Sequence, residues 1–255
     1  MTEDLVLTDY SGSIATITLN NPAKRNTLSI EMMTAVIDAF ETVAKSNALG
    51  VILAANGPVF SAGHNFGDML GATAQETTAI FALCTRMMDT IQSIPQPVIA
   101  KVASLATAAG CQLVATCDLA IAADTAAFAI PGGKGGLFCH TPLVAVARNV
   151  GRKRALELAL TGDPIDAATA ADWGLINRAV PLDKLDAAVD DLIRRATRGA
   201  SASKALGKAA FYKQVGLDQD DAYTYAVEVM GTAAAGPDAQ EGISAFLEKR
   251  KPSFH

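Results

Sequence analysis

The fold is decided by residues 29–55, which read SIEMMTAVIDAFETVAKSNALGVILAA. Ser29 is a suitable helix N-cap, and Glu31 adds negative charge to the first turn of a helix that we expect to run to about Lys45. Gly50–Ala55 then predicts a buried strand, because it is a short and continuous apolar run. A helix that leads into such a strand is typical of an α/β protein.

The chain repeats this pattern on both sides of that stretch. Short strands are predicted at residues 5–8 and 14–19, around a turn at Gly12. Residues 73–76 have capping-box spacing and predict a helix to about residue 94, followed by a strand at 97–102. A helix at 111–116 and extended segments at 118–123 and 127–130 come next. Alternation of strands and helices at this interval predicts parallel strands joined by crossover connections.

Helical periodicity dominates beyond about residue 141. Helices are predicted at residues 144–150, 152–160, 167–173, 182–198, 203–215, 218–234 and 237–249. We therefore expect an α/β core at residues 1–195 and a C-terminal helical region at residues 196–255. No Pro- or Ser-rich linker separates them, so the helices should lie on the core or on a neighbouring subunit.

The composition narrows the function classes. The 255 residues are 50% hydrophobic with a net charge of -5, which suits one large domain, or one domain with a helical appendage. No dense Lys/Arg stripe predicts nucleic-acid binding, and no apolar run is long enough for a membrane span. The first residues show no secretory signal.

The four cysteines are expected to be reduced, buried thiols, which favours a cytoplasmic location. No His/Cys/Asp/Glu group has the spacing of a metal site, so none is predicted.

Residues 132–136 read Gly-Gly-Lys-Gly-Gly. They are not a P-loop, because no Ser or Thr follows Lys134, and no strand and helix frame them as in a dinucleotide fingerprint. A flexible loop and a ligand-lining loop both remain open.

Two turns of small residues follow predicted strands: Phe60-Ser-Ala-Gly-His-Asn65 and Ala106-Thr-Ala-Ala-Gly-Cys111. Open α/β sheets bind ligands at the carboxyl ends of parallel strands, and the free N–H groups at a helix start favour negative charge. Each stretch alone is compatible with an ordinary tight turn. Together they would form an oxyanion hole for a thioester enolate.

Two of the three histidines, His64 and His140, lie inside the glycine-rich segments, and His255 is the last residue. A single loop histidine is more often structural or solvent-facing than catalytic. A thiol–imidazole pair of Cys139 and His140 is disfavoured, because adjacent residues rarely face each other.

Taken in order, several segments resemble the crotonase (enoyl-CoA hydratase/isomerase) family along nearly the whole chain. They are Asn21-Pro-Ala-Lys-Arg-Asn26 with Leu28, Phe60-Ser-Ala-Gly-His, Gln96-Pro-Val-Ile-Ala, Gly110-Cys-Gln-Leu, Cys117-Asp-Leu, Thr161-Gly-Asp-Pro-Ile, Gly174-Leu-Ile and the ending Glu241-Gly-Ile-Ser-Ala-Phe-Leu-Glu-Lys-Arg-Lys-Pro.

This resemblance implies a spiral of ββα units with C-terminal helices that assemble a trimer or a dimer of trimers. It implies an acyl-CoA or enoyl-CoA thioester as ligand, so that coenzyme A arrives with the substrate and no cofactor is bound permanently. The backbone N–H groups of His64 and Ala109 would be the oxyanion donors; glycine is usual at the second position, but alanine keeps the amide.

The same resemblance assigns the coenzyme A site. The ligand would lie across Arg25, Ala62 and Asn65. Lys249 and Lys251 would be candidates for its nucleotide phosphates, in the same chain or across a subunit interface.

The catalytic positions depart from the family pattern. Gln112 stands where a hydratase has its first glutamate, and Gly132 stands where it has the second. Hydration needs carboxylates that move protons, so hydration by the usual mechanism is not expected. His140 falls where some relatives, a dienoyl isomerase and an aryl-CoA dehalogenase, have a catalytic aspartate. The string Gly135-Gly-Leu-Phe-Cys-His-Thr-Pro also resembles a hydratase domain-containing branch that lacks both acids.

Two functions of different class therefore stay open. One is an enzyme that combines the oxyanion hole with His140 or another unusual group. A histidine side chain can act as a base or an acid at neutral pH. The other is a non-catalytic acyl-CoA carrier or sensor. A scaffold that does not bind coenzyme A would require the two turns to be occluded.

Overall fold

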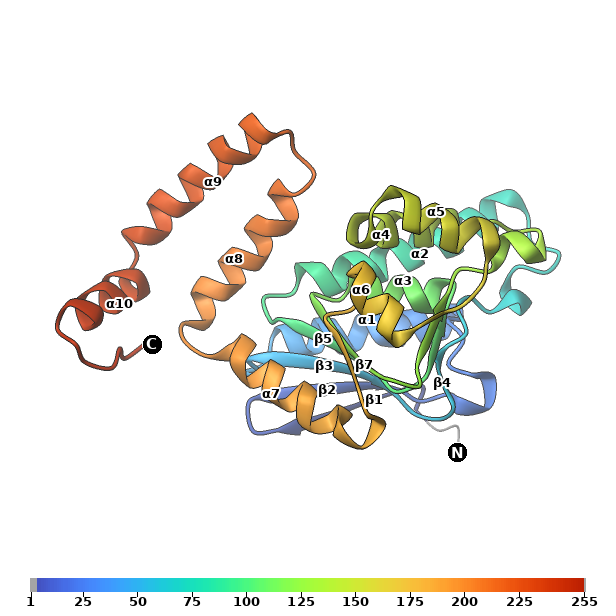
Figure 1. Ribbon diagram of the computed structural model, residues 1–255, viewed down its shortest axis with the longest axis horizontal. Helices are drawn as coiled ribbons and strands as arrows, with labels where there is room; N and C mark the ends of the chain where they lie inside the picture. The colour runs from blue at the N-terminus through green and yellow to red at the C-terminus, as the bar shows by residue number, and fades with distance from the viewer. Residues whose placement is uncertain (1–3, 255) are drawn as a thin grey trace.

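The computed structural model describes residues 4–254 and shows an α/β core from which the last helices project (Figure 1). A six-stranded sheet has the order β1-β2-β3-β5-β7-β10, and a four-stranded sheet has the order β4-β6-β8-β9. The first sheet contains β1 (Val6–Ser11), β2 (Ile14–Leu19), β3 (Gly50–Ala55), β5 (Val98–Val102), β7 (Leu119–Ala123) and β10 (Arg178–Val180). The second contains β4 (Val59–Ser61), β6 (Leu105–Thr107), β8 (Ala127–Ala129) and β9 (Ile165–Asp166). All neighbours are parallel except β1 with β2 and β8 with β9.

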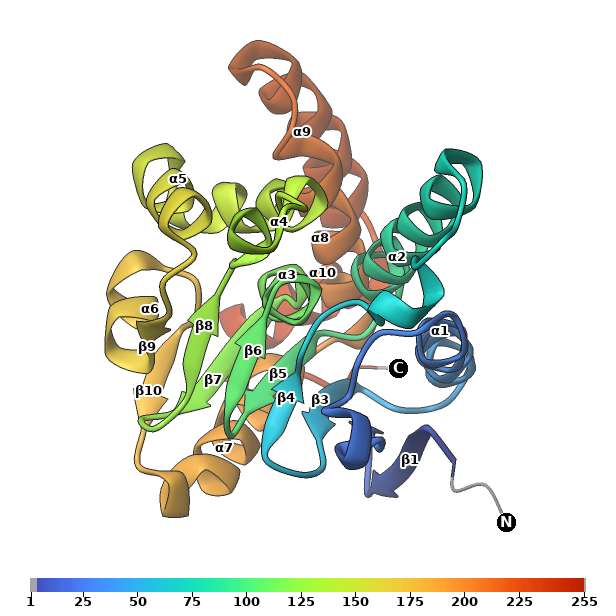
Figure 2. The ribbon, with the colours of Figure 1, turned by 90° about the vertical axis from the view of Figure 1, so that its right-hand side faces the viewer.

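Three consecutive ββα units build the core. They are β3-β4 with α2 (Ala74–Ser93), β5-β6 with α3 (Ala109–Thr116), and β7-β8 with α4 (His140–Val150). In each unit the first strand joins the larger sheet and the second strand joins the smaller one. Figure 2 shows β8, β6 and β4 side by side, with α3 above them. The predicted α/β spiral is therefore confirmed.

The predicted helix starts at Ser29 and Thr73 are also confirmed. The Ser29 side chain accepts a hydrogen bond from the N–H of Met32 at the start of α1 (Ile30–Ala44). Thr73 and Glu76 form a complete capping box at the start of α2. These caps satisfy backbone N–H groups that the helices themselves leave without acceptors.

Both faces of the larger sheet are covered. Val51 and Leu53 of β3 lie in the main core, whereas Ile52 faces α7 (Leu185–Thr197) because side chains alternate along a strand. The apolar side of α7 contributes Val189 and Ile193 to this second layer.

The remaining core elements are α5 (Arg152–Thr161), α6 (Ala167–Trp173) and the short 3₁₀ turns η1 (Pro22–Lys24), η2 (Phe66–Asp68), η3 (Gly132–Gly135) and η4 (Leu182–Lys184). Two helices begin earlier than predicted: α3 starts at Ala109 and α4 at His140. The segment predicted as one helix at 182–198 is η4 followed by α7. β4, β6, β9 and β10 have only two or three residues each, too few for a periodic signal.

The C-terminal helices form a projecting arm of α8 (Ser201–Gln214), α9 (Gln219–Ala234) and α10 (Pro237–Leu247), at the left of Figure 1. The chain leaves the core where α7 ends at Thr197; the domain division at residues 195 and 196 stays a prediction. Within residues 4–254, no helix has both the length and the apolar character required to cross a bilayer.

Candidate functional site

A cavity of about 160 Å³ lies where the first two units meet the start of α4. Its walls are mainly apolar, and the lining residues with polar side chains are His64, His140 and Thr141. The apolar side chains are those of Phe66, Met69, Phe81, Leu137, Phe138 and Pro142. Mostly apolar walls with a few polar groups are typical of small-molecule sites.

The two predicted turns meet at this cavity. A Cβ atom built on Gly63, whose φ is +83°, would lie 2.9 Å from the Cβ of Ala108 and 3.1 Å from the amide nitrogen of Ala109. Only glycine allows this approach. His64 and Ala109 both line the cavity, and neither backbone N–H donates a hydrogen bond to another group of residues 4–254. The structure thus brings the two predicted donor residues together.

Ala108 has a backbone conformation that alanine rarely adopts. Its φ is 52° and its ψ is -119°, and its N–H donates to the carbonyl oxygen of Ala129 at 2.9 Å. This conformation turns the chain sharply from β6 into α3, so that Ala109 is the first residue of the helix. Strained positions of this kind cluster at functional sites.

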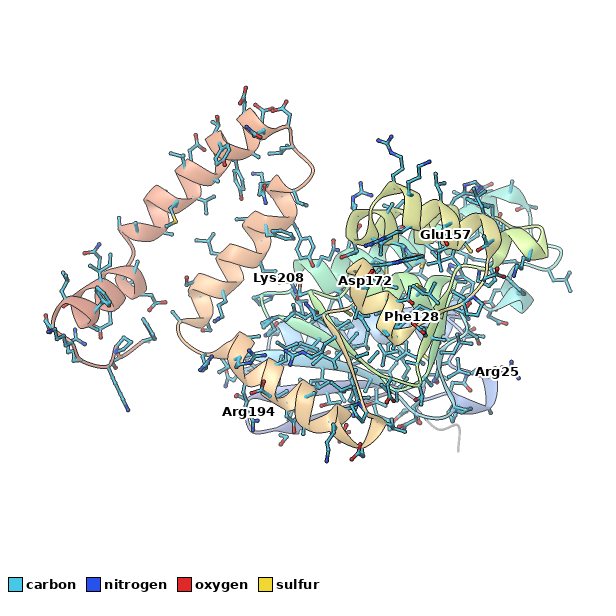
Figure 3. All side chains as sticks on the ribbon, viewed as in Figure 1. Arg25, Phe128, Glu157, Asp172, Arg194 and Lys208 are labelled. Carbon is cyan, nitrogen blue, oxygen red and sulfur yellow. The ribbon has the colours of Figure 1, made fainter. Side chains whose placement is uncertain are left out.

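The Asn21–Asn26 motif supports the first turn. Asn26 is fully buried, and its Nδ2 donates to the carbonyl oxygens of Asn56 and Val59, at 2.9 Å each. The Ala62 N–H donates to the Arg25 carbonyl oxygen at 3.0 Å, which places these two predicted coenzyme A residues side by side. The Arg25 side chain is exposed at the edge of the core (Figure 3).

The Asn65 side chain, by contrast, is engaged locally. It accepts from the Gly67 N–H and donates to the Asp68 carboxylate at 2.6 Å, as the N-cap of η2. Asp68 in turn accepts from the N–H of Ile30 at 3.0 Å. Any ligand contact by the Asn65 side chain would compete with these bonds.

The two positions where a hydratase has glutamates differ in their surroundings. Gln112 is 5% exposed, does not line the cavity, and its Oε1 has no hydrogen-bond partner among residues 4–254. Gly132 does line the cavity. A Cβ built on Gly132 would collide with the Leu137 carbonyl oxygen and lie 2.5 Å from Sγ of Cys139. The loop therefore leaves no room for a Cβ atom at residue 132.

His64 contributes a buried imidazole as well as its amide. The ring meets Phe81 edge to face, with centroids 5.3 Å apart. Neither ring nitrogen has a hydrogen-bond partner in the described residues, although the nearby Leu28 backbone partly stabilises the charged form. Burial lowers the pKa of His64, so this imidazole is neutral at physiological pH.

His140 occupies the first position of α4 rather than a loop. Its side chain is exposed and its ring lies 5.2 Å from that of Phe138. His140, His64 and Ala109 line the same cavity, so the structure brings His140 together with the two predicted donor residues.

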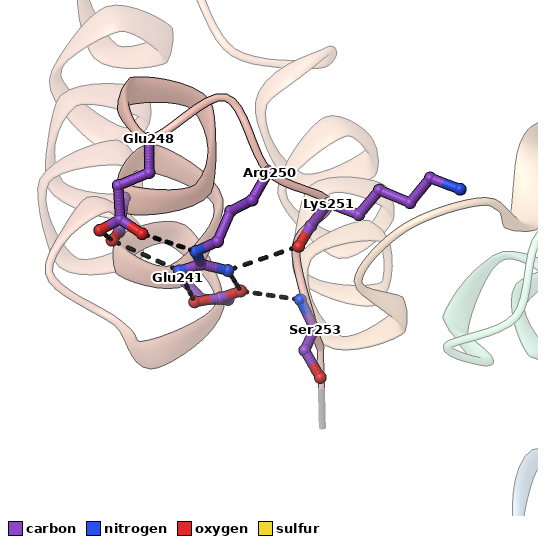
Figure 4. Close-up of polar contacts among 6 residues, drawn as sticks. Glu241, Glu248, Arg250, Lys251 and Ser253 are labelled. Carbon is purple, nitrogen blue, oxygen red and sulfur yellow. Dashed lines mark hydrogen bonds and ion pairs between the residues drawn. The ribbon is translucent and has the colours of Figure 1, made fainter.

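Lys249 and Lys251 lie on the chain end after α10, in the projecting arm, and neither lines the cavity. Figure 4 shows how Arg250 fixes this chain end, by donating to Glu241 at 2.6 and 2.8 Å and to Glu248 at 2.7 Å. Within one chain the two lysines are not brought to the site.

The four cysteines are free and buried. Burial raises the pKa of Cys84 and of Cys111 to about 12, and it raises the pKa of Cys117 and Cys139 as well. The thiols are therefore protonated at neutral pH. No three His, Cys, Asp or Glu residues in the described part of the chain are grouped to hold a metal ion.

Sequence reasoning included Asn26 and Ala108 within two motifs but missed their structural roles, and it missed the aromatic wall of the cavity. Nothing in the sequence marks Ala108, because its importance lies in its backbone conformation. The phenylalanines come from separate segments, which only the folded chain brings together.

Comparisons with known proteins agree with this geometry. Residues 9–255 match the family described as Enoyl-CoA hydratase/isomerase. The chain is 44% identical over 253 residues to the rat "Enoyl-CoA hydratase domain-containing protein 3, mitochondrial", covering 97% of this chain and 83% of the relative. A crystal structure titled as an enoyl-CoA hydratase of Mycobacterium smegmatis is 44% identical, with a TM-score of 0.95 over 98% of this chain and 99% of that one. The human enoyl Coenzyme A hydratase domain-containing protein 3 is 42% identical, with a TM-score of 0.92 over 98% of this chain and all of the other.

Proposed function

Since the chain belongs to the enoyl-CoA hydratase/isomerase (crotonase) family, we propose that it binds an acyl-CoA or enoyl-CoA thioester and polarises its carbonyl group without efficient hydration. The observation that carries this proposal is the pair of unengaged N–H groups of His64 and Ala109 at one cavity. Such donors stabilise negative charge on a thioester oxygen. Fixed backbone donors also need no reorganisation when that charge develops.

Hydration requires more than a polarised carbonyl. A carboxylate must activate the water, and an acid must protonate the α-carbon. Gln112 has no useful pKa, and Gly132 has neither a side chain nor space for one. Losing one acid–base group lowers the rate by about 10²–10⁴-fold, and this chain lacks both.

Mass spectrometry on a panel of CoA thioesters tests binding and conversion together. We expect saturable binding of saturated and 2-enoyl thioesters, with no conversion of crotonyl-CoA or of longer 2-enoyl-CoAs. Hydration at ordinary rates would contradict the proposal, and so would failure of every thioester to bind.

The Ala109 amide can be tested directly, because proline is tolerated at the first position of a helix but has no N–H. Ala109→Pro should weaken thioester binding at least fivefold, because it removes one hydrogen bond and puts the ring Cδ atom where the amide hydrogen pointed. It should also reduce the infrared shift of an isotope-labelled thioester carbonyl. Ala74→Pro at the first position of α2 is the matched control and should leave both unchanged.

His140 supports a second candidate, an enzyme with unusual acid–base chemistry. This exposed residue lines the cavity together with the two predicted donor residues. If the thioester panel reveals any conversion, His140→Ala should abolish that conversion and leave binding nearly intact. Conversion that survives the substitution would make His140 a bystander.

Assembly and location follow from the family resemblance and the thiols. We propose a homotrimer or a dimer of trimers, in which Lys249 and Lys251 of one subunit reach the nucleotide phosphates bound at another. The free, buried thiols favour a cytoplasmic location for this chain. The rat relative, by contrast, is described as mitochondrial.

A further inference from the structure

The later part of the α/β core contains a long stretch of sequence without acidic residues. No Asp or Glu occurs between Asp124 and Glu157, although the chain has 26 acidic and 21 basic residues in all. Lysine and arginine occur in this stretch at Lys134, Arg148, Arg152, Lys153 and Arg154. In a protein of net charge -5, this concentrates positive charge on η3, α4 and α5.

Two of these cations are paired and three are not. Lys134 pairs with Asp163 at 2.6 Å, and Arg154 pairs with Asp172 at 3.4 Å while lying over Trp173. Arg148, Arg152 and Lys153 are exposed and have no carboxylate partner among residues 4–254.

Local helix stability does not explain the charges of Arg152 and Lys153. Arg152 and Lys153 occupy the first turn of α5, where the positive end of the helix dipole disfavours cations. Arg148 lies in the last turn of α4, where the helix dipole favours a cation, and within residues 4–254 it donates only to the carbonyl oxygen of Val144.

Exposed apolar side chains lie beside the cations. α5 buries Ala155, Leu158 and Ala159, whereas Leu156 is 42% and Leu160 is 71% exposed. Because residues four apart share a helix face, Arg152, Leu156 and Leu160 form one outward stripe. Val144 is 54% exposed and stands one turn before Arg148 on α4, which packs against α5 (Figures 1 and 2).

We propose that this α4–α5 surface, formed by Val144, Arg148, Arg152, Lys153, Leu156 and Leu160, docks on an anionic lipid surface. The cations would meet lipid phosphates, and the leucines and valine would enter the boundary between headgroups and acyl chains. Nucleic acid offers phosphates but no such apolar layer, so charge and apolarity together fit a lipid surface better.

The surface lies next to the cavity, because α4 begins at His140 and α5 contacts η3. Docking would therefore hold the cavity close to a membrane, where long acyl thioesters partition. The proposal itself does not depend on thioester binding.

Vesicle sedimentation of the full chain tests the proposal. The chain should bind vesicles of phosphatidylcholine mixed with an equal amount of phosphatidylglycerol, but not vesicles of phosphatidylcholine alone. Each cation near an anionic surface is worth a factor of about five in partitioning. Arg152→Ala with Lys153→Ala should therefore lower the partition coefficient about 25-fold, and added salt should weaken binding of the unchanged chain.

A second pair of variants separates the apolar contribution. Leu156→Ser with Leu160→Ser should weaken binding but keep its dependence on phosphatidylglycerol and salt. Glu157→Gln removes the exposed carboxylate from the surface (labelled in Figure 3) and should strengthen binding.

The control is the exposed pair Arg194 and Arg198, of which Arg194 lies on α7 at the opposite side of the molecule (Figure 3). Arg194→Ala with Arg198→Ala should bind vesicles as the unchanged chain does. Equal binding by the α5 and control pairs would overturn the proposal, as would no binding at all. If the α5 pair instead alters the sedimentation coefficient without lipid, the surface is a contact between copies of the chain, and the proposal also fails.

Discussion

Three backbone positions around the cavity decide what the site can hold. Gly63 allows the first turn to approach the second, and Ala108 turns the chain so that α3 begins with a free amide at the cavity. Gly132 lies where the loop before α4 leaves no room for a side chain. At the residue scale, the site is therefore shaped by backbone conformation more than by side-chain chemistry.

Ala108→Gly should stabilise the protein. Relief of a strained φ contributes about 1–3 kcal/mol, and the added freedom of the unfolded chain offsets about 0.4–1 kcal/mol of it. Urea denaturation should therefore give a free energy of unfolding higher by about 1 kcal/mol. Ala106→Gly, at a fully buried position of β6, should be destabilising and serves as the control. A stability loss in Ala108→Gly would show that the conformation is not strained.

Gly132→Glu should not restore hydration. The new side chain would meet the Leu137 carbonyl oxygen and the Cys139 thiol, so the loop must shift, at a cost of about 1–3 kcal/mol. Gly135→Ala is the control, because nothing lies within 4 Å of its added methyl group. Thermal unfolding and a crotonyl-CoA hydration assay are the measurements; strong hydratase activity in Gly132→Glu would contradict the steric argument.

The pH dependence of stability should contain a contribution from His64. Its folded-state pKa lies below the ordinary value of 6.5, so the unfolded chain binds the proton more readily. The contribution is present above pH 6.5 and is lost as the pH falls toward the folded pKa. Urea titrations should give a difference in the free energy of unfolding between about pH 7.5 and about pH 5.5. This difference should be smaller in His64→Gln than in the unchanged chain. A stability difference that His64→Gln leaves unchanged would contradict this prediction.

At the element scale, a largely buried network of hydrogen bonds joins α8 of the arm to the core. Lys208 is only 9% exposed at its side chain and pairs with Asp118 at 2.8 Å. Its ammonium also donates to the carbonyl oxygens of Ile91 and Gln96, at 2.9 Å each. Asp118 accepts further bonds from the Tyr212 hydroxyl and the Val98 N–H, at 2.7 Å each. This network links α2, β5 and the start of β7 to α8; Lys208 is labelled in Figure 3.

Lys208→Met should loosen α8 more than it unfolds the core. Removing one partner of a buried ion pair costs about 3–5 kcal/mol, because the other charge stays buried without compensation. Hydrogen exchange of the α8 amides should accelerate, while the amides of β3 and β5 keep their protection. Lys204→Met removes a lysine of the same helix that has no ion-pair partner in residues 4–254, and it should leave exchange unchanged.

At the scale of the whole molecule, the arm exposes more apolar surface than a monomer needs. The exposed side chains include Tyr223, Val227, Met230, Phe246 and Leu247, each at least 67% exposed. Patches of this kind mark interaction surfaces. They fit the trimer that the family resemblance implies.

Val227→Lys should prevent assembly. A charge on the apolar face of α9 would be buried without a partner in the trimer, so analytical ultracentrifugation should give a smaller species than the unchanged chain forms. Glu228→Lys, an exposed neighbour on α9, adds positive charge to a polar position and should assemble normally. Equal sedimentation of both variants would exclude this face of α9 from the interface.

The sequence by itself determined the order of the longer strands and helices and the identity of the two turns. The apolar run at Gly50–Ala55 and the capping residues Ser29 and Thr73 act locally, so their pattern predicts strand and helix starts without knowledge of the fold. The sequence alone also shows that Gln112 and Gly132, rather than glutamates, stand at the two positions where the resemblance to hydratases places the catalytic carboxylates.

Only the tertiary structure decided which groups meet. Distances between separate segments of the chain decide the contact of Gly63 with Ala108 and the lack of space at Gly132. The exposed faces of α4 and α5 decide that their cations and apolar side chains lie together on the surface. Strain at Ala108 and burial of the His64 ring arise from the packed environment rather than from residue type. Periodicity predicts which elements form, whereas close packing determines how they fit together.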